Sequence, residues 1–198
     1  MANEERVIEI FKKTDVLMDG HFLLTSGKHS NQYMQCAKIQ QYPNYTQELM
    51  GILAENYKDK NIDYVVAPAV GGIIIGYELA RQLGVKNMFA EREEGKMTFR
   101  RGFELPKGSR VVVAEDVITT GGSVQEVIDI VKEQGSEVVG VAVLVDRSNG
   151  SADFGVKLDT TLTVKVEAWE EDECPLCKEG KIELVKPGSR NLKEKGTC

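Results

Sequence analysis

The chain has 198 residues, of which 41% are hydrophobic and 28% charged, and its formal net charge is −6. This length and composition can bury a proper core and differ from those of a disordered or disulfide-knotted chain. The acidic balance disfavours broad nucleic-acid binding, which needs a basic surface. The longest nearly apolar run, residues 65–77, is too short to cross a bilayer, and the first residues show no secretory signal. We therefore expect a soluble, cytoplasmic protein.

The N-terminal third predicts two helices separated by a β hairpin. Apolar residues at helical spacing indicate a first helix over residues 4–13. Short apolar stretches broken by glycines indicate a small hairpin within residues 19–39. Pro43 opens a second helix that runs to about Lys58.

After residue 61 the pattern changes to buried strands that alternate with helices. Amphipathic runs predict helices over residues 73–83 and 124–134. Apolar, β-branched runs predict strands over residues 64–67, 87–91, 110–116, 138–146 and 161–166. Strands joined by crossover helices form a parallel sheet covered on both faces, so the fold class predicted is α/β.

The most informative stretch is VVVAEDVITTGGSV at residues 111–124. An apolar strand delivers Glu115 and Asp116 to its carboxyl end, and a loop of small residues then leads into a helix N-terminus. Free amide groups and the helix dipole there favour a phosphate, while the acids suit sugar hydroxyls or a divalent cation. The nucleotide-binding motifs of NTPases and dinucleotide enzymes do not match this spacing. The stretch fits a ribose 5-phosphate, and a tight turn with exposed acids is the alternative.

This stretch resembles the phosphoribosyl pyrophosphate signature of the type I phosphoribosyltransferases. Four further segments resemble the orotate branch of that family. GHFLLTSGKHS at 20–30 is similar to the base-binding segment, PAVGG at 68–72 to the pyrophosphate loop, FAEREEGKMTFRRGFEL at 89–105 to the flexible catalytic loop, and VDRSNG at 145–150 to the segment with the base-binding arginine.

The resemblance implies a type I phosphoribosyltransferase fold, a parallel sheet flanked by helices, in one domain. Its parts would be a small N-terminal hood at about 1–60, a core at about 61–168 and a polar tail at 169–198. It also implies transfer of ribose 5-phosphate from phosphoribosyl pyrophosphate to orotate in pyrimidine synthesis, with Mg²⁺, by a homodimer whose loops reach the neighbouring site. A purine-base enzyme of the same fold, and a non-catalytic regulator that senses phosphoribosyl pyrophosphate, are the alternatives.

The resemblance also assigns roles to residues. Lys96 and Asp116 would carry catalysis, and Asp116 would meet Mg²⁺ mostly through the substrate. Orotate would contact Thr119, Arg147 and Lys28. For Arg147, pairing with Asp146 or with a surface acid is the alternative, and for Lys28 an ordinary turn lysine is the alternative. Phosphoribosyl pyrophosphate would contact Val70, Gly71, Arg92, Lys96, Glu115, Asp116, Val117, Ile118, Thr119, Thr120, Gly121, Gly122 and Ser123.

The chain departs from the common family pattern at three positions. Glu93 stands where lysine is frequent, Thr98 where histidine is frequent, and Thr25 where many relatives carry lysine. We expect that Arg100 or Arg101 compensates for the first two.

The segment 91–102 carries four cations and is expected to be an exposed loop. Cations there would stabilise the charge that develops on the departing pyrophosphate, and a mobile loop would exclude water. A solvated, salt-bridged surface loop is the alternative.

Four residues with metal-ligand chemistry have no role in this account. His21 and His29 are interpreted as loop residues that form no metal group with the paired cysteines. Cys174 and Cys177 form one CxxC in the polar tail, whereas a structural zinc site needs four ligands. A local turn with two reduced thiols is expected, and a redox pair or a metal shared between subunits is the alternative.

Overall fold

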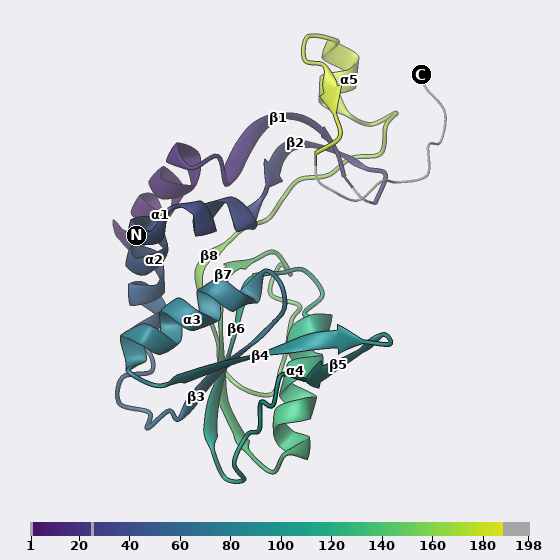
Figure 1. The fold of residues 1–198 in the computed structure, drawn as a ribbon. Coiled ribbons are helices and arrows are strands. Elements are labelled where there is room, and N and C mark those ends of the chain that lie inside the picture. The colour runs from purple at the N-terminus through teal and green to yellow at the C-terminus, as the bar shows by residue number, and fades with distance from the viewer. Residues whose placement is uncertain (1, 25, 188–198) are drawn as a thin grey trace.

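The main sheet has six strands in the order β5-β4-β3-β6-β7-β8 (Figure 1). The computed structural model describes residues 2–24 and 26–187. Neighbouring strands pair in parallel, except β4 and β5, which are antiparallel. The parallel pairing confirms the predicted α/β fold class. The strands are β3 (Tyr64–Pro68), β4 (Lys86–Glu93), β5 (Lys96–Phe99), β6 (Arg110–Ile118), β7 (Glu137–Asp146) and β8 (Leu158–Thr163).

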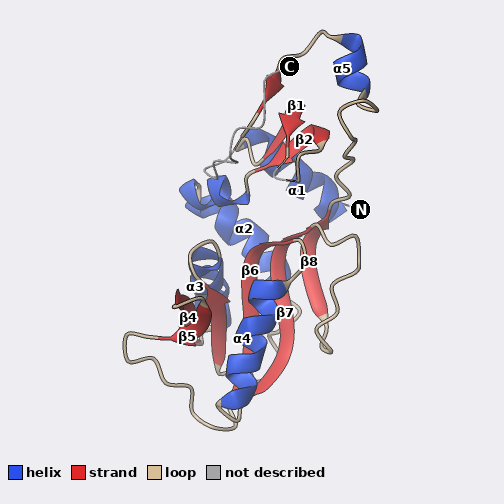
Figure 2. Ribbon diagram, turned by 90° about the vertical axis from the view of Figure 1, so that its right-hand side faces the viewer, coloured by secondary structure: helices blue, strands red, loops and turns tan. Residues whose placement is uncertain are grey.

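Helices cover both faces of this sheet (Figure 2). One face packs against α1 (Ala2–Lys13), α2 (Pro43–Ala54) and α3 (Gly72–Leu83), and the other packs against α4 (Gly122–Glu133). Because side chains alternate along a strand, Val112 of β6 lies in the first core and Val113 in the second. No helix in residues 2–24 or 26–187 is long and apolar enough to cross a membrane.

A second, small sheet has the order β2-β1-β9. The expected N-terminal hairpin is formed by β1 (Leu17–Leu23) and β2 (His29–Met34), and residues Cys36–Gln41 form a 3₁₀ helix, η1, instead of extending it. The third strand, β9 (Leu184–Val185), comes from the C-terminal segment, as does the short helix α5 (Pro175–Glu179). Figure 1 shows this yellow segment against the purple hairpin.

The charged segment 91–102 is not the loop that we expected from its composition. β4 continues to Glu93 and pairs with β5 as an antiparallel hairpin, with Glu93 opposite Lys96. The two connecting residues, Glu94 and Gly95, have φ values of 49° and 84°. Positive φ at both central residues defines the tight turn whose twist matches a two-residue hairpin. Turn geometry therefore overrides the high charge, which had suggested an irregular loop.

Candidate active site

Strand β6 carries two neighbouring carboxylates, Glu115 and Asp116, to the carboxyl edge of the main sheet. Both are buried, with 8% and 9% of their surface exposed. The backbone N–H of Asp116 donates to Glu115 Oε1 at 3.0 Å. Burial raises the pKa of both carboxyl groups, and for Glu115 the neighbouring charge of Asp116 raises it further. Such a pair favours a ligand that supplies hydroxyl donors or positive charge.

The turn after β3 lies directly against these acids. A Cβ atom added to Gly71 would lie 2.8 Å from Asp116 Oδ1, and one added to Gly72 would lie 3.0 Å from Glu115 Oε1. Glycine is therefore required for the turn to approach the carboxylates. The neighbouring Val70 is 80% exposed, and the peptide bond before it is cis. Because Val70 is exposed and the glycines approach the acids closely, the turn can present its backbone to a ligand held by the acids.

The Gly71→Ala substitution tests this close approach. The added methyl group must displace either the turn or Asp116, and a displacement of about 1 Å in an active site can cost about 100-fold in kcat/KM. Steady-state kinetics with phosphoribosyl pyrophosphate, the substrate that the resemblance implies, would measure the loss. Gly51→Ala is the matched control, because Gly51 lies within α2 and its added Cβ would meet only the flexible side chain of Gln82, at 3.3 Å. Equal activity of the two variants would contradict the assigned contact.

A pocket of about 300 Å³ lies where β6 passes into α4. Gly121 precedes the first turn of α4 with a φ of 77°, and an added Cβ there would lie 2.7 Å from the Phe154 ring. The free amides of this helix start favour a phosphate. The structure brings together in this pocket most of the residues predicted to bind phosphoribosyl pyrophosphate. The residues that line it are Arg92, Glu115, Val117, Ile118, Thr119, Thr120, Gly121, Gly122, Ser123, Val124 and Glu126.

The β4–β5 hairpin contributes one cation to this pocket and holds another in solvent. Arg92 Nη2 lies 2.7 Å from Glu126 Oε1 in the first half of α4, so the arginine is fixed beside the phosphate loop. Lys96 is exposed, and it forms no ion pair within the described part of the chain. Lys96 is therefore available to a ligand or to a neighbouring subunit.

The two other hairpin cations are paired with acids of the same hairpin. Arg101 Nε lies 2.7 Å from Glu91 Oε2, and Arg100 Nη2 lies 3.4 Å from Glu93 Oε1. These exposed pairs are the salt-bridged surface that we considered as the alternative for this segment. Compensation by either arginine for Glu93 or Thr98 stays a prediction.

Arg147 follows β7 and lies beside the phosphate loop. Its backbone N–H donates to the Ile118 carbonyl at 2.9 Å. Its Nε is buried and has no hydrogen-bond partner among the described residues. Asp146, one of the partners that the alternative named, accepts a 2.7 Å hydrogen bond from the Ser148 N–H instead. A half-buried guanidinium group with an unpartnered Nε and no ion pair among the described residues is suited to a carboxylate ligand.

Lys28 lies apart from the pocket lining. Its Nζ is 2.9 Å from Glu170 Oε1, an ion pair between the small sheet's hairpin and the C-terminal segment. The structure therefore does not bring Lys28 together with the phosphate loop, and its role in orotate binding stays a prediction. Thr25, where the family pattern has lysine, lies outside the described residues.

Three residues of the site have no signal in the sequence. Gln40, in η1, donates from Nε2 to the Gly71 carbonyl at 2.6 Å and so holds the turn after β3. Glu126 holds Arg92, and Phe154 packs against Gly121. Each comes from a different segment than the residue it touches, and a single glutamine, acid or phenylalanine outside a motif gives no indication of such a contact.

Comparison with known proteins identifies the class of this fold and site. Residues 35–171 match the family model of the phosphoribosyl transferase domain. The crystal structure of orotate phosphoribosyltransferase from Aeropyrum pernix superposes with a TM-score of 0.70 and 28% identity, covering 80% of this chain and 94% of that one. The chain belongs to the phosphoribosyltransferase family, with its type I fold.

Curated relatives refine the assignment within that family. A protein of Caldanaerobacter subterraneus, 58% identical over 96% of this chain and 99% of its own, is named orotate phosphoribosyltransferase. A protein of Desulforamulus reducens with the same name is 56% identical over 96% of this chain and 99% of its own. At this identity over nearly the full length of both chains, this protein groups with the orotate phosphoribosyltransferases.

Proposed function

We propose that this protein transfers the ribose 5-phosphate of phosphoribosyl pyrophosphate to orotate, releasing pyrophosphate and forming orotidine 5′-monophosphate. This reaction is a step of pyrimidine nucleotide synthesis. The observation that carries the proposal is the joint placement, at one edge of the main sheet, of the carboxylates Glu115 and Asp116, the phosphate pocket and Arg147, which has no ion pair among the described residues. High identity to relatives named orotate phosphoribosyltransferase supports the same reaction.

Each part of the site has a chemical role in this reaction. The loop at the start of α4 would hold the 5′-phosphate, and Glu115 and Asp116 would accept hydrogen bonds from the ribose hydroxyls. The exposed turn at Val70 and Gly71 would offer backbone amides to the pyrophosphate. As the bond to pyrophosphate breaks, positive charge develops on the ribose carbon and negative charge on the leaving group. Positioning and electrostatic stabilisation, without a covalent nucleophile, would therefore supply the catalysis.

Mg²⁺ fits the donor set of this site. Its preferred ligands are carboxylate and phosphate oxygens, and the buried Asp116 carboxylate forms none of the ion pairs found among the described residues. We propose that Asp116 meets the ion mainly through the bound substrate. When bound, the ion would neutralise charge on the pyrophosphate oxygens.

A direct assay tests the proposed function. Purified protein incubated with orotate, phosphoribosyl pyrophosphate and Mg²⁺ is expected to form orotidine 5′-monophosphate and pyrophosphate in equal amounts, identified by chromatography and mass. Omission of either substrate should abolish both products. Pyrophosphate release without the nucleotide, or no turnover by folded protein, would contradict the proposal.

We further propose a homodimer with shared active sites and a cytoplasmic location. The tip of the β4–β5 hairpin projects away from the body of the domain (Figure 1). Lys96 lies at this tip, opposite Glu93, and is exposed, so its cation can serve a neighbouring subunit. In the neighbouring active site, the Lys96 cation would stabilise the negative charge that develops on the departing pyrophosphate. This electrostatic stabilisation is far stronger in a closed active site than in solvent.

Subunit mixing tests the shared site. We expect Lys96→Ala and Asp116→Asn homodimers each to have little activity, and their mixture to recover about a quarter of the wild-type rate. Random exchange makes half of the dimers mixed, and one of the two sites in each mixed dimer is then whole. Activity after subunit exchange, with mixed dimers counted by native mass spectrometry, is the measurement. Mixed dimers without recovery would show that each Lys96 serves its own chain.

A further inference from the structure

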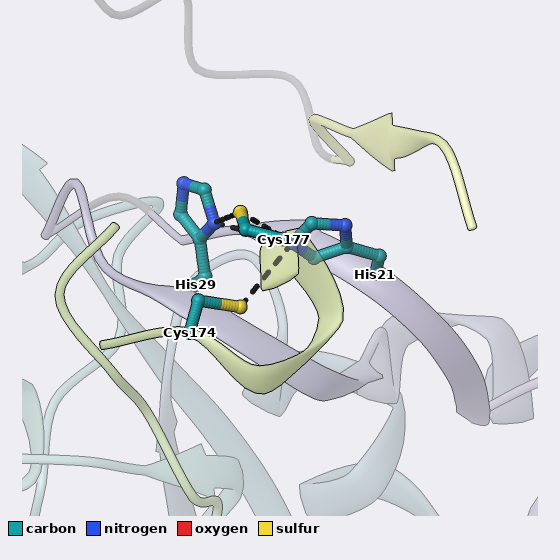
Figure 3. A group of neighbouring side chains, drawn as sticks. All are labelled: His21, His29, Cys174 and Cys177. Atoms are coloured by element: carbon teal, nitrogen blue, oxygen red, sulfur yellow. Dashed lines mark hydrogen bonds between the residues drawn. The ribbon is translucent and has the colours of Figure 1, made fainter. Parts of the chain in front are cut away.

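Four metal-ligating side chains from distant parts of the chain meet beside the small sheet (Figure 3). His21 lies in β1, His29 begins β2, and Cys174 and Cys177 come from the start of α5. Their ligand atoms all lie within 4.8 Å of one another. The two histidines are therefore strand residues that lie together with the paired cysteines, which corrects the interpretation of them as loop residues apart from the CxxC. The ligands were missed because the fold, and no short sequence spacing, joins the hairpin to the CxxC.

The separations between the ligand atoms, four of them 3.1–3.6 Å and all of them within 4.8 Å, are close to those of a tetrahedral zinc site. His21 Nε2 lies 3.1 Å from His29 Nδ1, which lies 3.1 Å from Cys177 Sγ. The sulfur atoms of Cys174 and Cys177 lie 3.5 and 3.6 Å from His21 Nε2. Zinc bonds of about 2.0–2.1 Å to nitrogen and 2.3 Å to sulfur place tetrahedral ligands about 3.3–3.8 Å apart. A single ion at the centre would thus reach all four atoms with little movement.

The surroundings of the cluster also suit a metal. His21 Nδ1 lies 3.1 Å from the Ile182 carbonyl and can donate its N–H to it. In this tautomer Nε2, which faces the cluster, carries no proton and is free to coordinate a metal. Both histidines are 3% exposed and Cys174 is fully buried. Two thiolates neutralise the charge of one Zn²⁺ ion, so the buried site would carry no net charge. Sulfur and imidazole nitrogen in a tetrahedron select zinc over the oxygen-seeking Mg²⁺.

The C-terminal segment is joined to the hairpin by backbone hydrogen bonds, two of them between His29 and Trp169, but it buries few side chains. Within residues 170–187, Cys174 is the only buried side chain. β9 has two residues, and Ile182, Leu184 and Val185 are all more than a third exposed. The ion pair between Lys28 and Glu170 is exposed, and such pairs contribute little. A segment that buries so little apolar surface needs another source of stability, which a metal can provide.

We propose that His21, His29, Cys174 and Cys177 form a structural zinc site that fastens the C-terminal segment to the β1–β2 hairpin. Four protein ligands fill a tetrahedron and leave no position for a substrate, so the site is structural rather than catalytic. One chain supplies all four ligands, so a second subunit is not needed to complete the site. A Cys174–Cys177 redox pair is the competing use of the same thiols.

Metal analysis of untagged protein, purified without chelator, tests the proposal. We expect one zinc ion per chain by elemental mass spectrometry. Replacement by Co²⁺ should give the visible absorption of a tetrahedral site with thiolate-to-cobalt charge transfer. Protein that contains no zinc and binds neither ion after reconstitution, while keeping its fold, would overturn the site. So would a Cys174–Cys177 disulfide in freshly isolated protein.

The variant Cys177→Ser tests the ligand assignment with little risk to folding, because Cys177 is exposed. Removing a residue that only hydrogen-bonds to a metal ligand lowers metal affinity about 10- to 100-fold. Removing the Cys177 thiolate, which is itself a ligand, should therefore weaken zinc binding by at least about 100-fold. Cys198→Ser, which alters a cysteine outside the described residues, is the control and should keep its zinc. Full zinc affinity in Cys177→Ser would overturn the assignment.

Limited proteolysis gives a readout that is independent of metal content. With zinc bound, the peptide bonds after Lys178 and Lys181 should resist trypsin, and chelation should expose them while the main sheet stays protected. Added zinc should restore protection in the wild type and in Cys198→Ser but not in Cys177→Ser. Identical cleavage with and without zinc would show that the metal does not hold the segment.

Discussion

The double variant Glu115→Gln, Asp116→Asn is expected to lose about 10²- to 10⁴-fold in kcat/KM for phosphoribosyl pyrophosphate. Each substitution replaces a charged acceptor of a ribose hydroxyl with a neutral one, and a hydrogen bond to a charged group is worth about 1.5–3 kcal/mol. The substitutions keep the shape of both side chains in a buried site. Steady-state kinetics with orotate saturating would measure the loss.

The same variant should be as stable as the wild type or more stable at neutral pH. Burial raises the pKa of Glu115 above its ordinary value of 4.5, so the unliganded folded state binds protons more tightly than the unfolded state. The stability contributed by this group is full below pH 4.5 and falls as pH rises toward the raised pKa. The neutral amide of the Glu115→Gln substitution removes that dependence. Thermal unfolding from pH 5 to 8 should therefore show a flatter profile in the variant.

Activity and stability together decide the role of the acid pair. Unchanged kcat/KM in the folded double variant would remove Glu115 and Asp116 from the site. A large loss of thermal stability at neutral pH would instead show that the carboxylates support the fold.

Arg147→Ala is expected to raise the KM for orotate roughly 30-fold or more while barely changing that for phosphoribosyl pyrophosphate. Orotate differs from uracil by a carboxylate, and loss of a charged hydrogen-bonding partner in a closed site costs about 2–5 kcal/mol. Arg147→Lys should recover only part of the loss, because an ammonium group cannot form two parallel hydrogen bonds to a carboxylate.

The matched control is Arg81→Ala, which removes an arginine from the exposed side of α3, where it pairs with Glu78. This control should keep both KM values. An unchanged orotate KM in folded Arg147→Ala would assign the carboxylate to another residue, and Lys28 would be the next to substitute.

Local pattern was sufficient to predict the α/β core. Buried strands of β-branched residues that alternate with amphipathic helices can be recognised from the local sequence alone. Strand β6, with its acid pair, lies where the sequence pattern predicted it. The hairpin at Glu94 and Gly95 was missed because charge was given more weight than a two-residue turn. The order of strands β5-β4-β3-β6-β7-β8 depends on pairing between distant segments, which no local window contains.

The candidate site was predictable where its residues are contiguous. The loop from Val117 to Ser123 carries its own signal, because glycines and hydroxyls after a strand suit a phosphate. Gln40 and Glu126 act on residues far away in the chain, and the zinc ligands combine a hairpin with a CxxC more than 140 residues later. Such contacts are set by tertiary folding, so residue type alone could not reveal them.

A competition assay tests the central claim most directly. Phosphoribosyl pyrophosphate and Mg²⁺ are supplied with equal concentrations of orotate, uracil, adenine, guanine and xanthine, and the nucleotides formed are separated and identified by mass. We predict that orotidine 5′-monophosphate is the product and that the other bases remain unchanged. Predominant formation of a purine nucleotide or of uridine monophosphate, with orotate left intact, would contradict the assignment.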